Sequence, residues 1–82
     1  MFKLSIITPT KVVFEEDVIS LTAPGDMGFF EVLSHHAPLM ATLKEGEFIV
    51  IDHEKKRLSW HIKGGFFEFN QNKATLLADD VS

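Results

Sequence analysis

Several things that could stabilise or anchor a small protein are missing from this 82-residue sequence. It contains no cysteine, so no disulfide can compensate for a small core and no thiolate metal site can form. No apolar run approaches the roughly 18–20 residues of a membrane-spanning helix. The start of the chain, Met1–Leu4, leads directly into alternating residues without the apolar core of a signal peptide. We therefore expect a protein made inside the cell that reaches any membrane through a partner.

Positive charge is also scarce. Lysine and arginine number 8 against 12 acidic residues, which gives a formal net charge of −4. A nucleic-acid-binding surface needs a broad basic face, and the only basic run is Lys55–Arg57. This run follows Asp52 and Glu54 and is typical of a solvated hairpin tip. We expect no nucleic-acid partner.

A sustained helical period is the third absence. Apolar residues instead recur at every second position, as in Phe2, Leu4 and Ile6, which is typical of strands with one face on a core. Turn residues such as Pro24-Gly25 and Gly64-Gly65 separate these short runs. The pattern predicts a single all-β domain over residues 1–82, a two-sheet antiparallel β-sandwich of about eight to ten short strands.

Aromatic residues are plentiful: the sequence has eight phenylalanines and one tryptophan, which suits a thin core between two sheets. Residues 34–43 fit either a helical turn or a strand, and Pro38 favours the strand. Besides one face of the phenylalanines, the predicted core comprises Leu4, Ile6, Leu21, Leu58, Trp60, Ile62 and Leu76.

The histidines do not form a metal-binding pattern. His35 and His36 are adjacent, and neighbouring residues of a strand point to opposite faces, so they cannot easily share an ion. His53 and His61 are isolated in the sequence, whereas a structural zinc site needs four ligands at suitable spacing. We expect no metal.

Catalytic patterns are equally weak. Ser34 precedes His35, but no nucleophile elbow surrounds the pair. Glu15–Asp17 is a charge cluster in a predicted bend. The segment Gly25–Gly28 lacks the lysine and the following helix of a phosphate-binding loop and is predicted to be a tight turn. We expect no catalytic residue and no bound cofactor.

One longer segment is more specific. Residues 19–46 contain a Pro-Gly-x-x-Gly turn, then His-Ala-Pro-Leu, then Leu-x-x-Gly. Gly-Gly-Phe-Phe-Glu at 64–68 and Lys-Ala-Thr-Leu-Leu-Ala-Asp at 73–79 follow in order. Together with Ile6–Pro9 and Phe14, these motifs resemble the N-terminal β-sandwich domain of the epsilon subunit of F-type ATP synthases. Departures occur at Glu31 and His35, where the family usually has glycine, and at Ser34, where it often has proline.

The resemblance implies a non-catalytic subunit of the central stalk. It would couple rotation of the membrane c-ring and the gamma subunit to ATP synthesis or hydrolysis, on the cytoplasmic face of a proton-transporting, energy-transducing membrane. The gamma-facing positions would be Thr8, His36 and Ala41. The positions facing the c-ring would be Gly25, Asp26, Met27, Gly28, Phe29 and Phe30. The family's two C-terminal helices do not follow residue 82, so we expect no bound ATP and no self-inhibition by this chain.

Two other interpretations remain open. A free-standing β-sandwich that binds a ligand would have an enclosed pocket and no stalk partner. A small metalloenzyme of the β-barrel type would bind its metal through His35 or His36.

Overall fold

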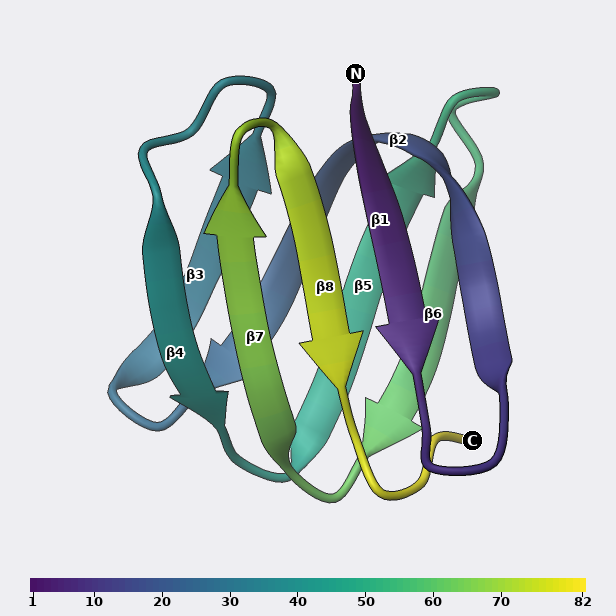
Figure 1. The fold of residues 1–82 in the computed structure, drawn as a ribbon, viewed down its shortest axis with the longest axis vertical. Helices are drawn as coiled ribbons and strands as arrows, with labels where there is room; N and C mark the ends of the chain where they lie inside the picture. Colours follow the sequence, from purple (N-terminus) through teal and green to yellow (C-terminus); the bar gives the residue numbers. More distant parts are fainter.

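The structure, a computed structural model, describes all residues 1–82 and contains eight β-strands and no helix (Figure 1). This confirms the all-β prediction, and the eight strands observed lie within the predicted range of about eight to ten. No element is a helix long and apolar enough to cross a bilayer. The strands are β1 (Phe2–Ile7), β2 (Val12–Gly25), β3 (Gly28–Leu33), β4 (Leu39–Leu43), β5 (Gly46–Asp52), β6 (Arg57–Ile62), β7 (Gly65–Asn70) and β8 (Lys73–Leu77).

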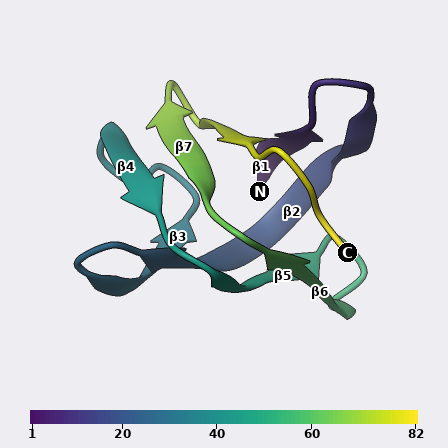
Figure 2. The same cartoon turned by 90° about the horizontal axis from the view of Figure 1, so that it is seen from below.

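The strands form two layers, which Figure 2 shows from below. The front layer of Figure 1 has the order β4-β7-β8-β1, and the first half of β2 pairs with β1 at its edge. The back layer contains β3, the second half of β2, β5 and β6. Sixteen buried apolar residues fill the space between the layers as one cluster. The two layers are thus parts of one continuous sheet that is folded over its core.

Strand β2 passes from one layer to the other. Its ladder with β5 shifts register between Val18 and Ser20, and such a shift bends and twists a strand. Val18 and Leu21 are both buried as a result, while Ile19 is only half-buried. A regular alternation over Ile19, Leu21 and Ala23 would bury Ile19 as well, but the register shift interrupts that alternation.

Strands β1 and β8 run parallel, from the pair Lys3 and Lys73 to the pair Ile7 and Leu77. Every other strand pair is antiparallel. Alternation within one strand carries no information about the direction of its neighbour, so the sequence did not predict this exception to the antiparallel sheet.

The predicted core is largely the observed one. Leu4, Ile6, Leu21, Ile62 and Leu76 are no more than 1% exposed. Leu58 and Trp60 are the exceptions, being half-buried against the core. They lie on β6, the edge strand of the back layer, where fewer neighbours cover a side chain.

The strand predicted over residues 34–43 is shorter than expected and begins only at Leu39. His35 has a φ of 64°, which is a left-handed conformation that breaks an extended strand. The His36 N–H donates to the Leu33 carbonyl (3.1 Å) and closes a turn. Residues 34–38 therefore form a loop at the end of β3.

Candidate binding surfaces

The turn between β2 and β3 projects two apolar side chains into solvent. We call residues Gly25–Phe30 the tip turn. Met27 is fully exposed and Phe29 is 63% exposed. The Asp26 N–H donates to the Thr42 carbonyl (3.0 Å), and the Lys44 N–H donates to the Pro24 carbonyl (2.9 Å). These bonds fix the tip turn to β4, so Met27 is presented on an anchored turn.

The two phenylalanines of the tip turn point to opposite sides. Phe30 is half-buried, and its ring centroid lies 5.6 Å from that of the core residue Phe67. Phe29 faces outward, as strand alternation predicts. Gly28 has a φ of 122°, a conformation that other residues adopt only at a cost. The sequence therefore uses glycine here to reverse the chain while leaving Phe29 on the surface.

A hollow of about 390 Å³ lies between the tip turn and β4. Met40 of β4 lines it together with Met27 and Phe30, and Met40 is 67% exposed. Exposed apolar surface costs roughly 25 cal/mol per Å² in water, and such clusters commonly mark contact sites. The tip turn and Met40 together form an apolar surface suited to binding a partner.

The three positions expected to face gamma do not form one patch. Thr8 follows β1, whereas His36 lies in the β3–β4 loop at the opposite end of the molecule (Figure 1). Ala41 is half-buried and packs against the core. Since alternate residues of a strand face opposite sides, the side chains that β4 presents outward are those of Met40 and Thr42, both exposed. Ala41 could take part in such a contact only through its backbone and its neighbours.

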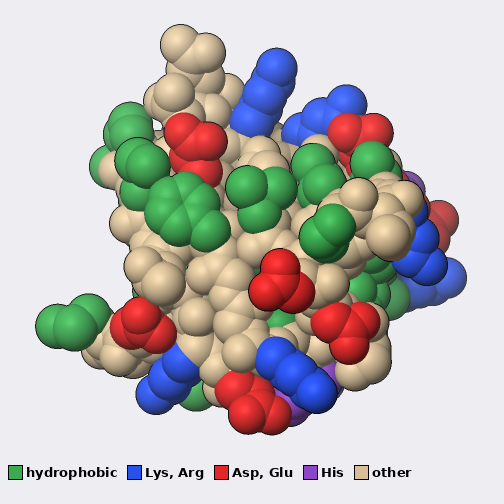
Figure 3. Space-filling model, turned by 60° about the horizontal axis from the view of Figure 1, so that its bottom comes forward, with side chains coloured by type: hydrophobic (Ala, Val, Ile, Leu, Met, Phe, Trp, Pro, Cys, Tyr) green, Lys and Arg blue, Asp and Glu red, His purple; other side chains and the backbone are tan.

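A row of apolar side chains crosses the outer face of the front layer at its lower end. We call it the foot row: Phe66 pairs with Leu77, Leu77 with Ile7, and Ile7 with Val12. Leu77 is 47% exposed and Val12 is 54% exposed. Figure 3, which brings this end forward, shows hydrophobic side chains in a band across the face. The foot row is a second exposed apolar surface on this small domain.

Sequence reasoning missed the foot row. The four residues are far apart in sequence, and each occupies a position that alternation assigns to solvent or to a strand end. The available signal was the presence of apolar residues at outward positions next to buried ones, as Phe66 is next to Phe67 and Leu77 next to Leu76. Only strand pairing reveals that they form a row.

The adjacent histidines of the β3–β4 loop make local contacts. The His35 N–H donates to the Asn72 side-chain carbonyl (2.7 Å), which ties this loop to the β7–β8 turn. His36 Nδ1 lies 2.7 Å from the Ala37 carbonyl, and its ring centroid is 5.9 Å from that of Phe69. The Ser34 hydroxyl has no hydrogen-bond partner, so it is not paired with an imidazole. The structure contains no group of three or more potential metal ligands.

His61 lies between two carboxylates on the outer face of the back layer. Its Nδ1 is 2.8 Å from Glu47 and its Nε2 is 3.0 Å from Glu45. The bond to Glu47, followed by the bond to Glu45, raises the pKa of His61. Hydrogen bonds from Ser59 and then His61 lower the pKa of Glu47. Because every group in this cluster is at least partly exposed, the cluster is a surface clasp between β5 and β6.

Comparison with known proteins gives a consistent result. Residues 1–82 match the family model described as "ATP synthase, Delta/Epsilon chain, beta-sandwich domain". The chain is 48% identical over 81 residues to the ATP synthase epsilon chain of Chlorobium limicola, covering 99% of this chain and 92% of that protein. It is 43% identical to the ATP synthase epsilon chain of Protochlamydia amoebophila, of which it covers 55%. The chain thus spans nearly the whole of one relative and about half of the other.

Solved structures show the same fold at lower sequence identity. A chain in the structure of the Euglena gracilis mitochondrial ATP synthase (OSCP/F1/c-ring) superposes with a TM-score of 0.91 at 21% identity, over 96% of this chain and 51% of that one. A chain from the central stalk and c-ring of the Tetrahymena thermophila mitochondrial enzyme gives a TM-score of 0.82 at 13% identity, over 98% and 64% of the two chains.

Proposed function

Because the chain belongs to the ATP synthase delta/epsilon β-sandwich family, we propose that it is a non-catalytic subunit of the central stalk of a proton-transporting F-type ATP synthase. It turns with the gamma subunit and the c-ring and transmits torque between them by shape complementarity. Its place is on the cytoplasmic face of the energy-transducing membrane, held there by the complex.

The observation that carries this proposal is the pair of apolar surfaces at one end of the domain. The tip turn exposes Met27 and Phe29, and the foot row exposes Phe66, Leu77 and Val12. A small soluble domain gains nothing from leaving such side chains in water. Two surfaces on different sides of one end suit a subunit that is held between two partners.

The family resemblance assigns the tip turn to the c-ring and Thr8, His36 and Ala41 to gamma, and we extend the gamma side to the foot row. The tip turn faces the polar loops of the c-ring, with Met27 and Phe29 as apolar contacts and Asp26 available to a basic side chain. The outer face of the front layer faces gamma. On that face Thr8 lies beside the foot row, His36 lies at the far end of the layer, and Ala41 acts through its exposed neighbours on β4.

A double substitution at the tip turn tests the proposal. Met27→Asp combined with Phe29→Asp should leave the domain folded, because both side chains are largely exposed. The charged pair should weaken assembly on the ring and uncouple ATP hydrolysis from proton pumping. The measurements are the thermal unfolding of the purified chain and ATP-driven pumping by the reconstituted synthase in vesicles.

A matched control adds the same negative charge elsewhere. Asn70→Asp with Gln71→Asp changes the β7–β8 turn at the opposite end of the molecule, where both side chains are exposed, and pumping should be normal. If the tip-turn variant also pumps normally, the tip turn is not the ring contact. If its isolated domain unfolds, Met27 and Phe29 are part of the folded core instead.

A further inference from the structure

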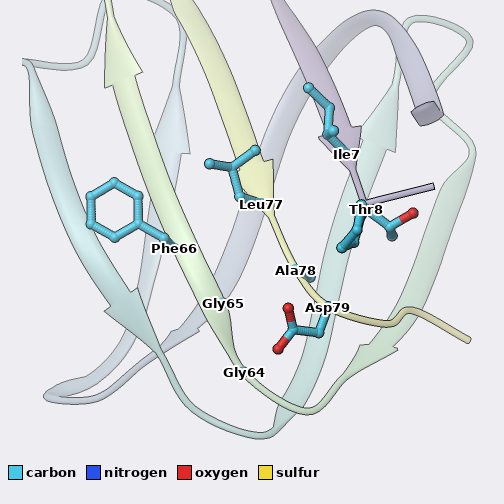
Figure 4. Close-up of a pocket in the computed structure, with 9 residues that line it drawn as sticks. Ile7, Thr8, Gly64, Gly65, Phe66, Leu77, Ala78 and Asp79 are labelled. Carbon is cyan, nitrogen blue, oxygen red and sulfur yellow. The ribbon is translucent and has the colours of Figure 1, made fainter. Parts of the chain in front are cut away.

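A hollow of about 420 Å³ lies at the lower end of the front layer, beside the foot row (Figure 4). We call it the foot pocket. It is built by the ends of β1 and β8 with the residues that follow them, and by the start of β7 with Gly64, which precedes it. Its lining includes Ile7, Thr8, Gly64, Gly65, Leu77 and Asp79.

Two consecutive glycines line the foot pocket. A Cβ on Gly65 would come within 2.6 Å of the Leu77 carbonyl oxygen, a distance that real side chains do not reach. Gly64 has a φ of 143°, in a region that side chains rarely adopt. Neither position can carry a side chain without strain, so the backbone itself forms one wall of the pocket.

The rest of the lining combines apolar side chains with Thr8 and a single carboxylate, that of Asp79. Leu77 and Phe66 contribute partly exposed hydrocarbon and aromatic surface. Figure 4 shows the Asp79 carboxylate directed from the end of β8 toward Gly64 and Gly65. Asp79 makes no ion pair and no side-chain hydrogen bond, and no lysine or arginine lines the pocket. The pocket thus offers a free negative charge beside apolar surface.

An arginine side chain complements this combination. Its hydrocarbon stem can lie against Leu77, as long basic side chains do on apolar surfaces. Its planar guanidinium can pair with a carboxylate through two hydrogen bonds. Lysine provides the charge and the stem but not the planar, two-pronged contact.

We propose that the foot pocket receives one arginine side chain of the gamma subunit, with its guanidinium on Asp79 and its stem along Leu77 and Phe66. This inference rests on the proposed function, since it takes gamma as the partner of the front layer. It adds a specific anchor to that interface. In the complex this ion pair is shielded from water, where losing one partner has a larger effect than at an exposed site.

The test measures binding of the whole chain to the purified gamma subunit of the same synthase, by titration calorimetry. Asp79→Asn keeps the shape and removes the charge, and it should weaken binding about tenfold. Asp80→Asn is the matched control, because it makes the same change at the next residue, which does not line the pocket. It should bind within about twofold of the unchanged chain.

Arginine is then identified from the gamma side. Each arginine of gamma is changed singly to glutamine and to lysine. At one arginine position, the glutamine substitution should weaken binding of gamma to the unchanged chain but should not weaken its binding to the Asp79→Asn variant further. The lysine variant at that position should bind less tightly than arginine. The proposal is overturned if Asp79→Asn binds gamma as tightly as Asp80→Asn, or if no arginine shows this dependence on Asp79. If the unchanged chain does not bind gamma at all, the proposed stalk function fails as well. Binding that is independent of Asp79 would overturn only the arginine anchor.

Discussion

Two neighbouring phenylalanines show how one residue step in a strand changes a side chain's role. Phe67 is completely buried, and its ring centroid lies 5.6 Å from Phe30 and 6.3 Å from Phe48. Phe66 is 38% exposed and belongs to the foot row. The pleat of β7 directs one ring into the core and the other toward a partner. The first should therefore determine folding and the second binding.

Truncating each ring should separate these roles. Phe67→Ala removes a fully buried ring and leaves a cavity, so it should lower the free energy of unfolding by about 3–5 kcal/mol. Phe66→Ala, the matched control on the same strand, should lower it by about 1 kcal/mol or less. Urea unfolding followed by circular dichroism gives both values. Equal losses at the two positions would contradict the assignment of Phe66 to a binding surface.

At the scale of elements, His61 connects β6 to its neighbours on both sides. Its side chain bonds Glu47 on β5 and Glu45 just before β5. Its backbone N–H donates to the Ser82 carbonyl (2.7 Å), and the Ser82 N–H donates to the His61 carbonyl (3.0 Å). The end of the sequence is thereby held against the edge of β6, where Val81 and Ile62 form an isolated antiparallel bridge. His61 thus takes part both in the charged clasp, through its ring, and in the edge of the back layer, through its backbone.

The clasp should make stability depend on pH. Since the pKa of His61 is raised, its contribution is complete below the ordinary value of 6.5 and is lost as the pH rises through the folded-state value. Since the pKa of Glu47 is lowered, its contribution is complete above 4.5 and is lost as the pH falls. The destabilisation caused by His61→Gln should therefore be larger at about pH 5.5 than at about pH 8.5.

The thermal unfolding midpoints of the unchanged chain and of His61→Gln, each measured at both pH values, give this difference. His53→Gln is the control, because it makes the same substitution at a histidine whose ring is 3.9 Å from Glu16 and makes no hydrogen bond to it, and it leaves the clasp intact. A destabilisation by His61→Gln that is the same at both pH values would show that the clasp does not titrate with folding.

Most elements could be predicted from the sequence, because each strand carries its own alternation and each turn its own glycine, proline or asparagine. Gln71 and Asn72, for example, both have positive φ values, of 51° and 61°, in the two-residue turn between β7 and β8, and asparagine is favoured in turns of this kind. What could not be predicted depends on pairing between distant segments. The parallel β1–β8 pair, the bulge near Ile19 and the foot row all arise from neighbours that a single strand does not specify.

The same limit applies to the candidate surfaces. The tip turn could be located because Gly25 and Gly28 bracket its two-residue loop, and the outward direction of Phe29 follows from alternation. Ala41 could not be placed, because its facing depends on where β4 begins, and His35 delays that start. The foot pocket was not visible in the sequence, since its lining comes from three separate segments.

On the scale of the whole molecule, β2 belongs to both layers and joins them into one unit. Phe14 on its first half packs against Trp60 of β6, with ring centroids 5.0 Å apart. Neither layer can lose its structure without disturbing the other. We expect the domain to unfold in one cooperative step, as most small single domains do.

Two spectroscopic probes test this cooperativity. Trp60 fluorescence reports on the contact between the layers, and far-ultraviolet circular dichroism reports on the strands of both. In a urea titration the two transitions should coincide in midpoint and slope. A fluorescence change that precedes the loss of strand signal would show that the layers separate before they unfold.

The parallel pair of β1 and β8 also constrains the order in which the protein can fold during its synthesis. Of these eight strands β1 is translated first, but one of its two hydrogen-bonded neighbours, β8, is translated last. Until β8 emerges, β1 can pair only with β2, and the apolar side of the nascent front layer stays uncovered. Pairing of segments so distant in sequence is intrinsically slow, because a long loop must be closed before any contact forms. We therefore expect the nascent chain to expose apolar surface, of the kind that chaperones bind, until translation of this domain is nearly complete.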